Sequence, residues 1–189
     1  IRDVAVTGVQ TCALPILVGR RLAEVLGEGV GQPGFWELMI VASDLDTQSD
    51  VVATMLQEPY RHDFIAPRPG RERRAEVVDL AGAGREHGVE VMAAALVPPV
   101  CTEPYGLRFA PDEFWKGETH RIIDRPGAVV RLCEELAAAG VSQVILVSAH
   151  TAVNQPHHVR PAGFDPRSRL GEYLETAETT ALRDALEIG

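Results

Sequence analysis

Three short, largely apolar runs constrain the fold of this chain more than any other feature of its sequence. They span residues 38–43, 89–96 and 144–147, and turn-forming residues lie near their ends. Short apolar runs of this kind are typical of strands that are buried on both faces of a parallel sheet. Amphipathic segments lie between the runs, and strands that alternate with helices predict right-handed βαβ units.

Helical signals surround these runs. Asp46 or Thr47 can cap a helix that follows the first run, and Gly88 can end the helix before the second run. Pro126 and Gly140 are suited to the first position and the end of a further helix. We predict an α/β fold, namely a three-layer, Rossmann-like domain with a mainly parallel sheet and a long loop over residues 98–125. The predicted helices span residues 17–26, 48–57, 71–87, 126–140 and 168–186.

Residues 1–16 resemble the translation of a sequencing-library adaptor. Residues 6–16 can be back-translated into adaptor DNA and residues 1–3 into its upstream arm, and the two residues between them fall where a variable index lies. We therefore expect residues 1–16 to be artefactual and not to pack against the rest. The native protein would begin near Leu17 with its amino-terminal part missing. Residues 17–189 would form a single α/β domain that is truncated at its amino end.

Composition narrows the classes of partner. A net charge of −9 with no basic stripe argues against nucleic acid and against an anionic membrane surface. The chain holds 46% hydrophobic and 24% charged residues, as soluble globular proteins do, and it has no apolar run long enough to span a membrane. Because no CxxC pair occurs, we expect a reduced, cytoplasmic setting. A small-molecule ligand stays open as a partner, and the oligomeric state is not determined.

Polar side chains follow two of the predicted strands. Ligands bind beyond the carboxyl ends of strands in open parallel sheets. Asp44 and Asp46 follow the first strand, where they can bind a ligand or act as a base, or where Asp46 can simply cap the next helix. Ser148 and His150 follow the third strand, and at that spacing they can serve as nucleophile and general base. We assign Asp44, Ser148 and His150 as candidate catalytic residues and Asp46 as a candidate substrate-binding residue.

The long loop carries a second group of reactive side chains. Glu118, His120, Arg121 and Arg125 are candidate substrate-binding residues, because the two arginines can clamp a phosphate or a carboxylate. The alternative is an ion-paired network that fixes the loop before the following helix. The adjacent pair His157 and His158 lacks a metal-binding signature such as HExxH, so no metal site is predicted, and no cofactor can be named.

Two stretches resemble segments of patatin-like acyl hydrolases. Residues 40–47, Ile-Val-Ala-Ser-Asp-Leu-Asp-Thr, are similar to a family segment that reads Val-Ala-Thr-Asp-Leu-x-Thr-Gly, and residues 140–148 are similar to a late strand of that family. The resemblance covers under a tenth of the chain and implies hydrolysis by a Ser-Asp pair. The sequence departs from the family in having no GxSxG elbow and no Asp-Gly dipeptide, so no catalytic residue is carried over.

Three functions follow as hypotheses. The first is a hydrolase fragment that acts on an ester or amide bond, with His150 as the base. The second is a Rossmann-like binding or transferase domain for a nucleotide, a sugar or another anionic metabolite. The third is a non-catalytic module of a larger protein, with the last helix as a docking surface. The concentration of polar residues in the long loop favours an enzyme.

Overall fold

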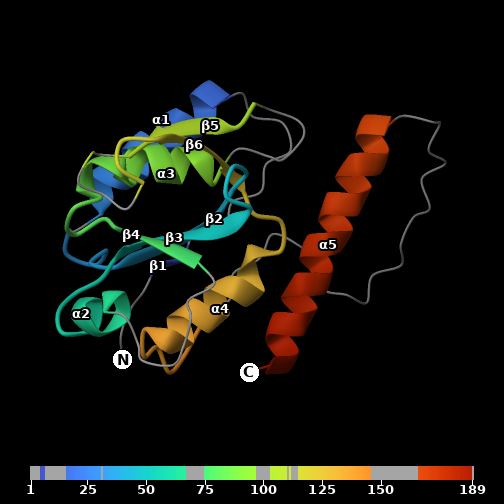
Figure 1. The fold of residues 1–189 in the computed structure, drawn as a ribbon. Helices are drawn as coiled ribbons and strands as arrows, with labels where there is room; N and C mark the ends of the chain where they lie inside the picture. Colours follow the sequence, from blue (N-terminus) through green and yellow to red (C-terminus); the bar gives the residue numbers. More distant parts are fainter. Residues whose placement is uncertain are drawn as a thin grey trace.

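The protein is an α/β structure in which helices pack on a mixed β-sheet (Figure 1). The computed structural model describes residues 5–6, 16–30, 32–66, 75–96, 103–109, 111, 115–145 and 166–188. The strands are β1 (Ala5–Val6), β2 (Leu38–Asp44), β3 (Ser49–Met55), β4 (Ala75–Asp79), β5 (Tyr105–Arg108) and β6 (Thr119–Asp124). The helices are α1 (Ile16–Gly29), α2 (Tyr60–Ile65), the 3-10 turn η1 (Arg85–His87), α3 (Gly88–Ala94), α4 (Ala128–Ala138) and α5 (Pro166–Ile188).

Strand β2 is the centre of the sheet. The strand order is β4-β3-β2-β6-β5, and β1 also pairs with β2. The predicted strand over residues 38–43 is confirmed, and its side chains are buried almost without interruption because helices cover both faces. Strand β1 runs parallel to β2, with Ala5 opposite Leu38 and Val6 opposite Met39. The expectation that residues 1–16 do not pack against the rest is therefore wrong for these two residues.

The helix predicted over residues 48–57 is wrong, because residues 49–55 form β3. The chain reverses through a turn at residues 45–48, and β3 then pairs antiparallel with β2 over seven residue pairs. Val51 and Val52 are β-branched and fully buried in this central position, so tertiary packing decides their conformation. After α2, the chain returns as β4 parallel to β3, which forms one βαβ unit, although not between the strands that were predicted.

Two further predictions are wrong, because a predicted helix contains a strand and a predicted strand lies mainly in a helix. The segment over residues 71–87, predicted as a helix, contains β4, in which the adjacent Val77 and Val78 fit a pleated strand. The run over residues 89–96, predicted as a buried strand, lies mainly in α3. Three consecutive alanines at positions 93–95 favour the helix, and α3 buries its apolar face against the sheet.

The long loop predicted over residues 98–125 contains a pair of strands. Strands β5 and β6 pair antiparallel, and β6 joins the sheet beside β2, also antiparallel. Val144 and Ile145 are not in a strand and are exposed, which corrects the prediction at these positions, while residues 146–147 lie outside the described residues. The mainly parallel, Rossmann-like sheet is not confirmed, since three of the five pairings between the described strands are antiparallel.

Helices α1, α4 and α5 confirm three of the predicted helices. Helix α4 ends as expected at Gly140, which has φ +82°. The N–H groups of Gly140 and Val141 donate to the carbonyls of Ala137 and Leu136, which is the Schellman arrangement. None of the helices in the described part of the chain is both long and apolar enough to cross a membrane.

The core has one cluster on each face of the sheet. Helices α1 and α3 cover the face that carries Ile40, Ala42 and Ile122. On the opposite face, α2 contributes Phe64 and α4 contributes Leu132 and Leu136, and these pack against Met39, Val41 and Val52. The two layers of helices fix β2 and β6 in the middle of the molecule.

Truncation of Leu136 tests this packing. Leu136 is 2% exposed between α4 and the sheet. We expect Leu136→Ala to lower the free energy of unfolding by about 2–5 kcal/mol, since it removes buried surface and leaves a cavity. Urea titration followed by circular dichroism measures this loss. The neighbouring Ala137 is exposed, and Ala137→Ser should change the free energy by less than about 0.5 kcal/mol. Equal effects of the two substitutions would contradict the packing described.

Candidate functional site

The site begins at the turn between β2 and β3, which Asp44 holds in shape. Its Oδ1 accepts the backbone N–H of Asp46 at 2.8 Å and that of Thr47 at 3.3 Å. An aspartate that binds the backbone two residues ahead forms an Asx turn. Gln48 closes the turn with φ +56°. The sequence placed Asp44 just before a predicted helix. In the structure its carboxylate instead shapes a tight turn at the end of β2.

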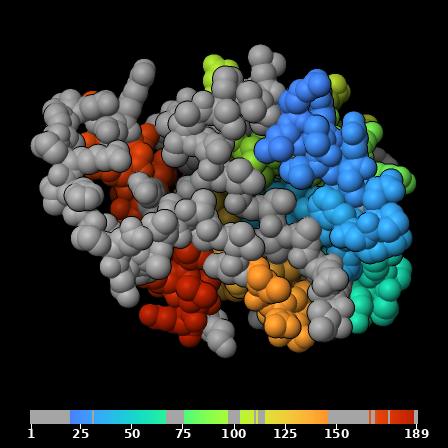
Figure 2. Space-filling view, turned by 180° about the vertical axis from the view of Figure 1, so that it is seen from behind, coloured from blue at the N-terminus to red at the C-terminus, as the bar shows by residue number. Residues whose placement is uncertain are grey.

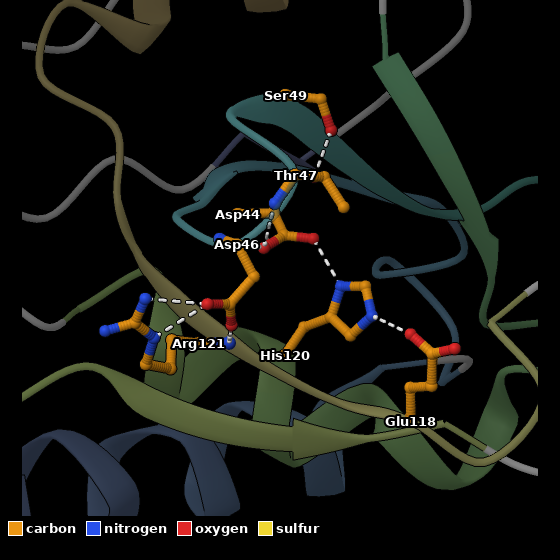
Figure 3. A network of polar contacts seen from close by, with 7 residues as sticks. All are labelled: Asp44, Asp46, Thr47, Ser49, Glu118, His120 and Arg121. Atoms are coloured by element: carbon orange, nitrogen blue, oxygen red, sulfur yellow. Dashed lines mark hydrogen bonds and ion pairs between the residues drawn. The ribbon is translucent and has the colours of Figure 1, made fainter.

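Strand β6 brings His120 to this carboxylate. Ile122 lies opposite Asp44 in the antiparallel register, and His120 lies two residues earlier, so it shares the face of the sheet with Ile122. His120 Nδ1 lies 2.6 Å from Asp44 Oδ2 (Figure 3). Because an ionised carboxylate can only accept, Nδ1 carries the hydrogen of this bond. The side chains of Asp44 and His120 are 0% and 5% exposed, so this is a buried dyad.

Aromatic rings enclose the imidazole. The ring of Phe109 meets His120 edge-on at 5.4 Å between centroids, and the ring of Trp115 lies at 4.7 Å. Phe109 and Trp115 also contact each other at 4.4 Å. These rings exclude water from one side of the dyad, which strengthens the electrostatic attraction within it.

Glu118 reaches the other ring nitrogen of His120. Its Oε2 lies 3.4 Å from Nε2, and its side chain is 71% exposed. Figure 3 shows the imidazole between the two carboxylates, with Asp44 on one nitrogen and Glu118 on the other. The short, buried contact fixes the ring, whereas the long, exposed contact is readily replaced by another hydrogen-bonding group.

A second ion pair ties the turn to β6. Arg121 donates to Asp46 Oδ1 from Nε at 2.9 Å and from Nη2 at 2.7 Å, and its backbone N–H donates to Asp46 Oδ2 at 2.8 Å. The backbone carbonyl of Arg121 accepts the N–H of Leu45 at 2.9 Å. These bonds hold the residues after Asp44 against the residue after His120, so they set the spacing of the dyad.

The contact between Asp44 and His120 shifts the pKa of each side chain so that its charged form is favoured. Burial opposes ionisation of Asp44, but the hydrogen bonds from His120 and from the turn leave its pKa lower than usual. Burial likewise opposes protonation of His120, yet the hydrogen bond and the charge of Asp44 raise its pKa overall. Hydrogen bonds from Arg121 lower the pKa of Asp46. The site therefore holds an imidazolium against a carboxylate until the pH exceeds the raised pKa of His120.

The structure brings together five of the candidate residues, namely Asp44, Asp46, Glu118, His120 and Arg121. Arg125 is directed elsewhere, since its Nε donates to Asp50 Oδ1 on β3 at 2.6 Å. An aspartate therefore engages each arginine of the expected anion clamp, as the alternative of an ion-paired network predicted. Ser148 and His150 lie outside the described residues, as do His157 and His158.

Two features of the site were missed by the sequence interpretation. The first is the contact of Phe109 and Trp115 with His120, which the sequence did not suggest. The second is the pairing of Asp44 with His120, which were assigned to separate groups of candidates. Exposed and buried positions alternate over residues 119–122 in the structure, but polar and apolar side chains do not alternate there in the sequence, so the sequence carried no clear signal for this strand. Recognition of that strand would have placed His120 inside the protein and required a partner for it.

Comparisons of the chain with protein-family models, with curated proteins and with solved structures found no match. The described residues include no group of three or more His, Cys, Asp or Glu side chains arranged to hold a metal ion.

Removal of the buried carboxylate tests the dyad directly. We expect Asp44→Asn to lower the pKa of His120, because a neutral amide does not stabilise the imidazolium, and two-dimensional NMR titration of the histidine ring measures it. Glu118→Gln is the matched control and should change this pKa much less, since its contact is long and exposed. A pKa of His120 that is unchanged in Asp44→Asn would contradict the assigned hydrogen bond.

The same pair makes stability depend on pH in a defined window. The raised pKa of His120 contributes stability that is full below its ordinary value of 6.5 and is lost as the pH rises through the raised value. The lowered pKa of Asp44 contributes stability that is full above its ordinary value of 3.8 and is lost as the pH falls through the lowered value. Asp44→Asn should therefore cost most near pH 5, about 1.5–3 kcal/mol, and less at pH 9.

Proposed function

We propose that the chain is a hydrolase that acts on an ester or amide bond, with His120 as its general base and Asp44 as the residue that orients it. The observation that carries the proposal is the 2.6 Å bond between a fully buried carboxylate and Nδ1 of a histidine whose Nε2 lies towards an exposed side chain. In acyl-transfer enzymes a buried carboxylate on Nδ1 fixes the tautomer that leaves Nε2 able to accept a proton. The sequence interpretation gave the base as His150, which lies outside the described residues, and the contact with Asp44 supports His120 in that role.

The proposed reaction needs only water and the substrate. Neutral His120 takes a proton at Nε2 from a water molecule as the water oxygen attacks the carbonyl carbon. Asp44 stabilises the imidazolium that forms. The tetrahedral intermediate then collapses, the bond from carbon to the ester oxygen or amide nitrogen breaks, and the imidazolium returns its proton to that leaving atom. Glu118 has to leave Nε2 when substrate binds, and its long, exposed contact allows this.

An anion-binding function receives less support from the same site. Asp46 takes up two nitrogens of Arg121, and Asp50 takes up Nε of Arg125. A phosphate or carboxylate would have to compete with these aspartates. The carboxylates of Asp44 and Glu118 also flank the histidine, and they repel an anionic ligand.

Hydrolysis of a panel of p-nitrophenyl esters and anilides by the full chain tests this proposal. We expect His120→Gln to reduce kcat/KM by about 10²–10⁴-fold, the usual contribution of a general base. The wild-type rate should rise with pH through the raised pKa of His120, because only the neutral imidazole accepts a proton. The exposed His62 on α2 provides a matched control, and His62→Gln should keep full activity.

Three results would count against the proposal. Absence of hydrolysis across the panel would remove the hydrolase assignment. Full activity in a folded His120→Gln variant would place the base elsewhere in the chain. Covalent labelling by a fluorophosphonate probe would reveal a serine nucleophile, and Ser148→Ala would then show whether that serine is Ser148. Circular dichroism of each variant separates loss of activity from loss of folding.

A further inference from the structure

Glu118 presents an exposed carboxylate from a fixed backbone, directly beside the dyad. Its backbone N–H donates to the carbonyl of Trp115 at 2.9 Å, and its carbonyl accepts the N–H of Phe109 at 3.0 Å. Its side chain is nevertheless 71% exposed. A ligand that binds this carboxylate therefore does not have to order the backbone that carries it, which lowers the entropic cost of binding.

A tight turn places Trp115 next to this carboxylate. Lys116 and Gly117 are its two central residues, with φ +46° and +84°. Positive φ at both central positions is the conformation of a type I′ turn, and a residue other than glycine rarely adopts it. The turn ends at Glu118, so Trp115 and Glu118 are joined across it by the hydrogen bond between their backbones.

The ring of Trp115 adds a surface that suits a cation. Its centroid lies 4.7 Å from that of His120, and the residue is half-buried, so part of it is open to a ligand. Cations bind over the face of tryptophan more strongly than over the other aromatic rings. A negative charge and an aromatic ring thus lie together beside the proposed base.

The charges around the dyad leave Glu118 without a cation during catalysis. Two nitrogens of Arg121 donate to Asp46. Within the described residues, the ion pair recorded for Glu118 is the one with His120. The proposed mechanism requires His120 to be neutral when it accepts a proton, and the carboxylate then has no positive charge opposite it. A cationic ligand would restore this charge balance.

The distances fix where such a cation would sit relative to the scissile bond. Glu118 Oε2 lies 3.4 Å from His120 Nε2. An ammonium that donates to this carboxylate lies about 2.8 Å from its oxygen, and hence within roughly 6 Å of Nε2. A carbonyl carbon attacked by a water molecule that is bound to Nε2 lies at a similar distance. The cation and the carbonyl are therefore close together in the substrate.

We propose that the substrate is an ester or amide whose acyl group carries an ammonium one or two carbons from the scissile carbonyl, and that Glu118 and Trp115 bind this ammonium. The inference rests on the proposed hydrolase function and adds the chemical class of the acyl group. A bound ammonium takes over the carboxylate that contacts Nε2, which frees this nitrogen for the attacking water. Glu118 is thus a specificity-determining residue.

A pair of substrates with the same shape and different charge tests this inference. N,N,N-trimethylglycyl p-nitroanilide carries a fixed positive charge, and 3,3-dimethylbutanoyl p-nitroanilide is its neutral carbon isostere. The measured quantity is the ratio of kcat/KM for the charged substrate to that for the neutral one. Glu118→Gln should lower this ratio by about tenfold, mainly through KM, because the attraction between the two charges is lost. Comparison of variants removes the intrinsic difference in reactivity between the substrates.

Glu134→Gln is the matched control. It removes the same charge from an exposed side chain on α4. Helices α1 and α4 lie on opposite sides of the sheet in Figure 1 and in the view from behind in Figure 2, and His120 is on the side of α1. The control should leave the ratio unchanged. Trp115→Leu should lower it, since it keeps an apolar side chain and removes the aromatic face.

Binding of simple probes gives a test that needs no turnover. The chain has two tryptophans, so Trp36→Phe assigns the remaining indole N–H signal in the ¹H–¹⁵N NMR spectrum to Trp115. Tetramethylammonium should shift this signal, whereas tert-butanol, which is of similar size and neutral, should not. The shift should be much smaller when Glu118→Gln is added.

The two tests separate this inference from the hydrolase function. A cation-specific NMR shift without hydrolysis of either substrate would remove the hydrolase function and keep the cation site. Hydrolysis with a charge ratio that Glu118→Gln does not change would keep the hydrolase function and overturn the inference. Equal responses of the Trp115 signal to both probes would overturn it as well.

Discussion

The buried carboxylate of Asp44 is the interaction on which the centre of the molecule depends. One of its oxygens shapes the turn that reverses the chain from β2 into β3, and the other binds His120 on β6. A single side chain therefore joins three strands at the end of the sheet where the candidate site lies. An ionised carboxylate is tolerated in such a place only when hydrogen bonds replace its hydration, and here the turn and the imidazole supply them.

The sequence predicted correctly those elements whose local signals and tertiary environment agree. Residues 38–42 are apolar throughout and lie in the middle of the sheet. Gly140 follows the end of α4 in the left-handed conformation that its residue type favours. The predictions failed where the two conflict. The capping signal at Asp46 and Thr47 favoured a helix, but Val51 and Val52 pair with β2. The alanines of α3 resemble a buried strand only in their hydrophobicity.

The residues of the candidate site were named from the sequence, but their arrangement was not predicted. Asp44, Asp46, Glu118, His120 and Arg121 were all singled out as reactive residues near a sheet edge. The contacts between these residues were not predicted, because the register between β2 and β6 depends on residues more than seventy positions apart. Residues 119–124 were also predicted as a loop. Polar side chains in an exposed loop need no buried partner, so none was sought for His120.

Strand β6 carries an ionisable group at each of its ends that faces the protein interior. His120 and Asp124 are four residues apart in one extended segment, a span of roughly 13 Å at the rise of a β-strand. Backbone pairing of β6 with β2 on one side and with β5 on the other holds this segment along its length, so His120 is kept aligned with Asp44.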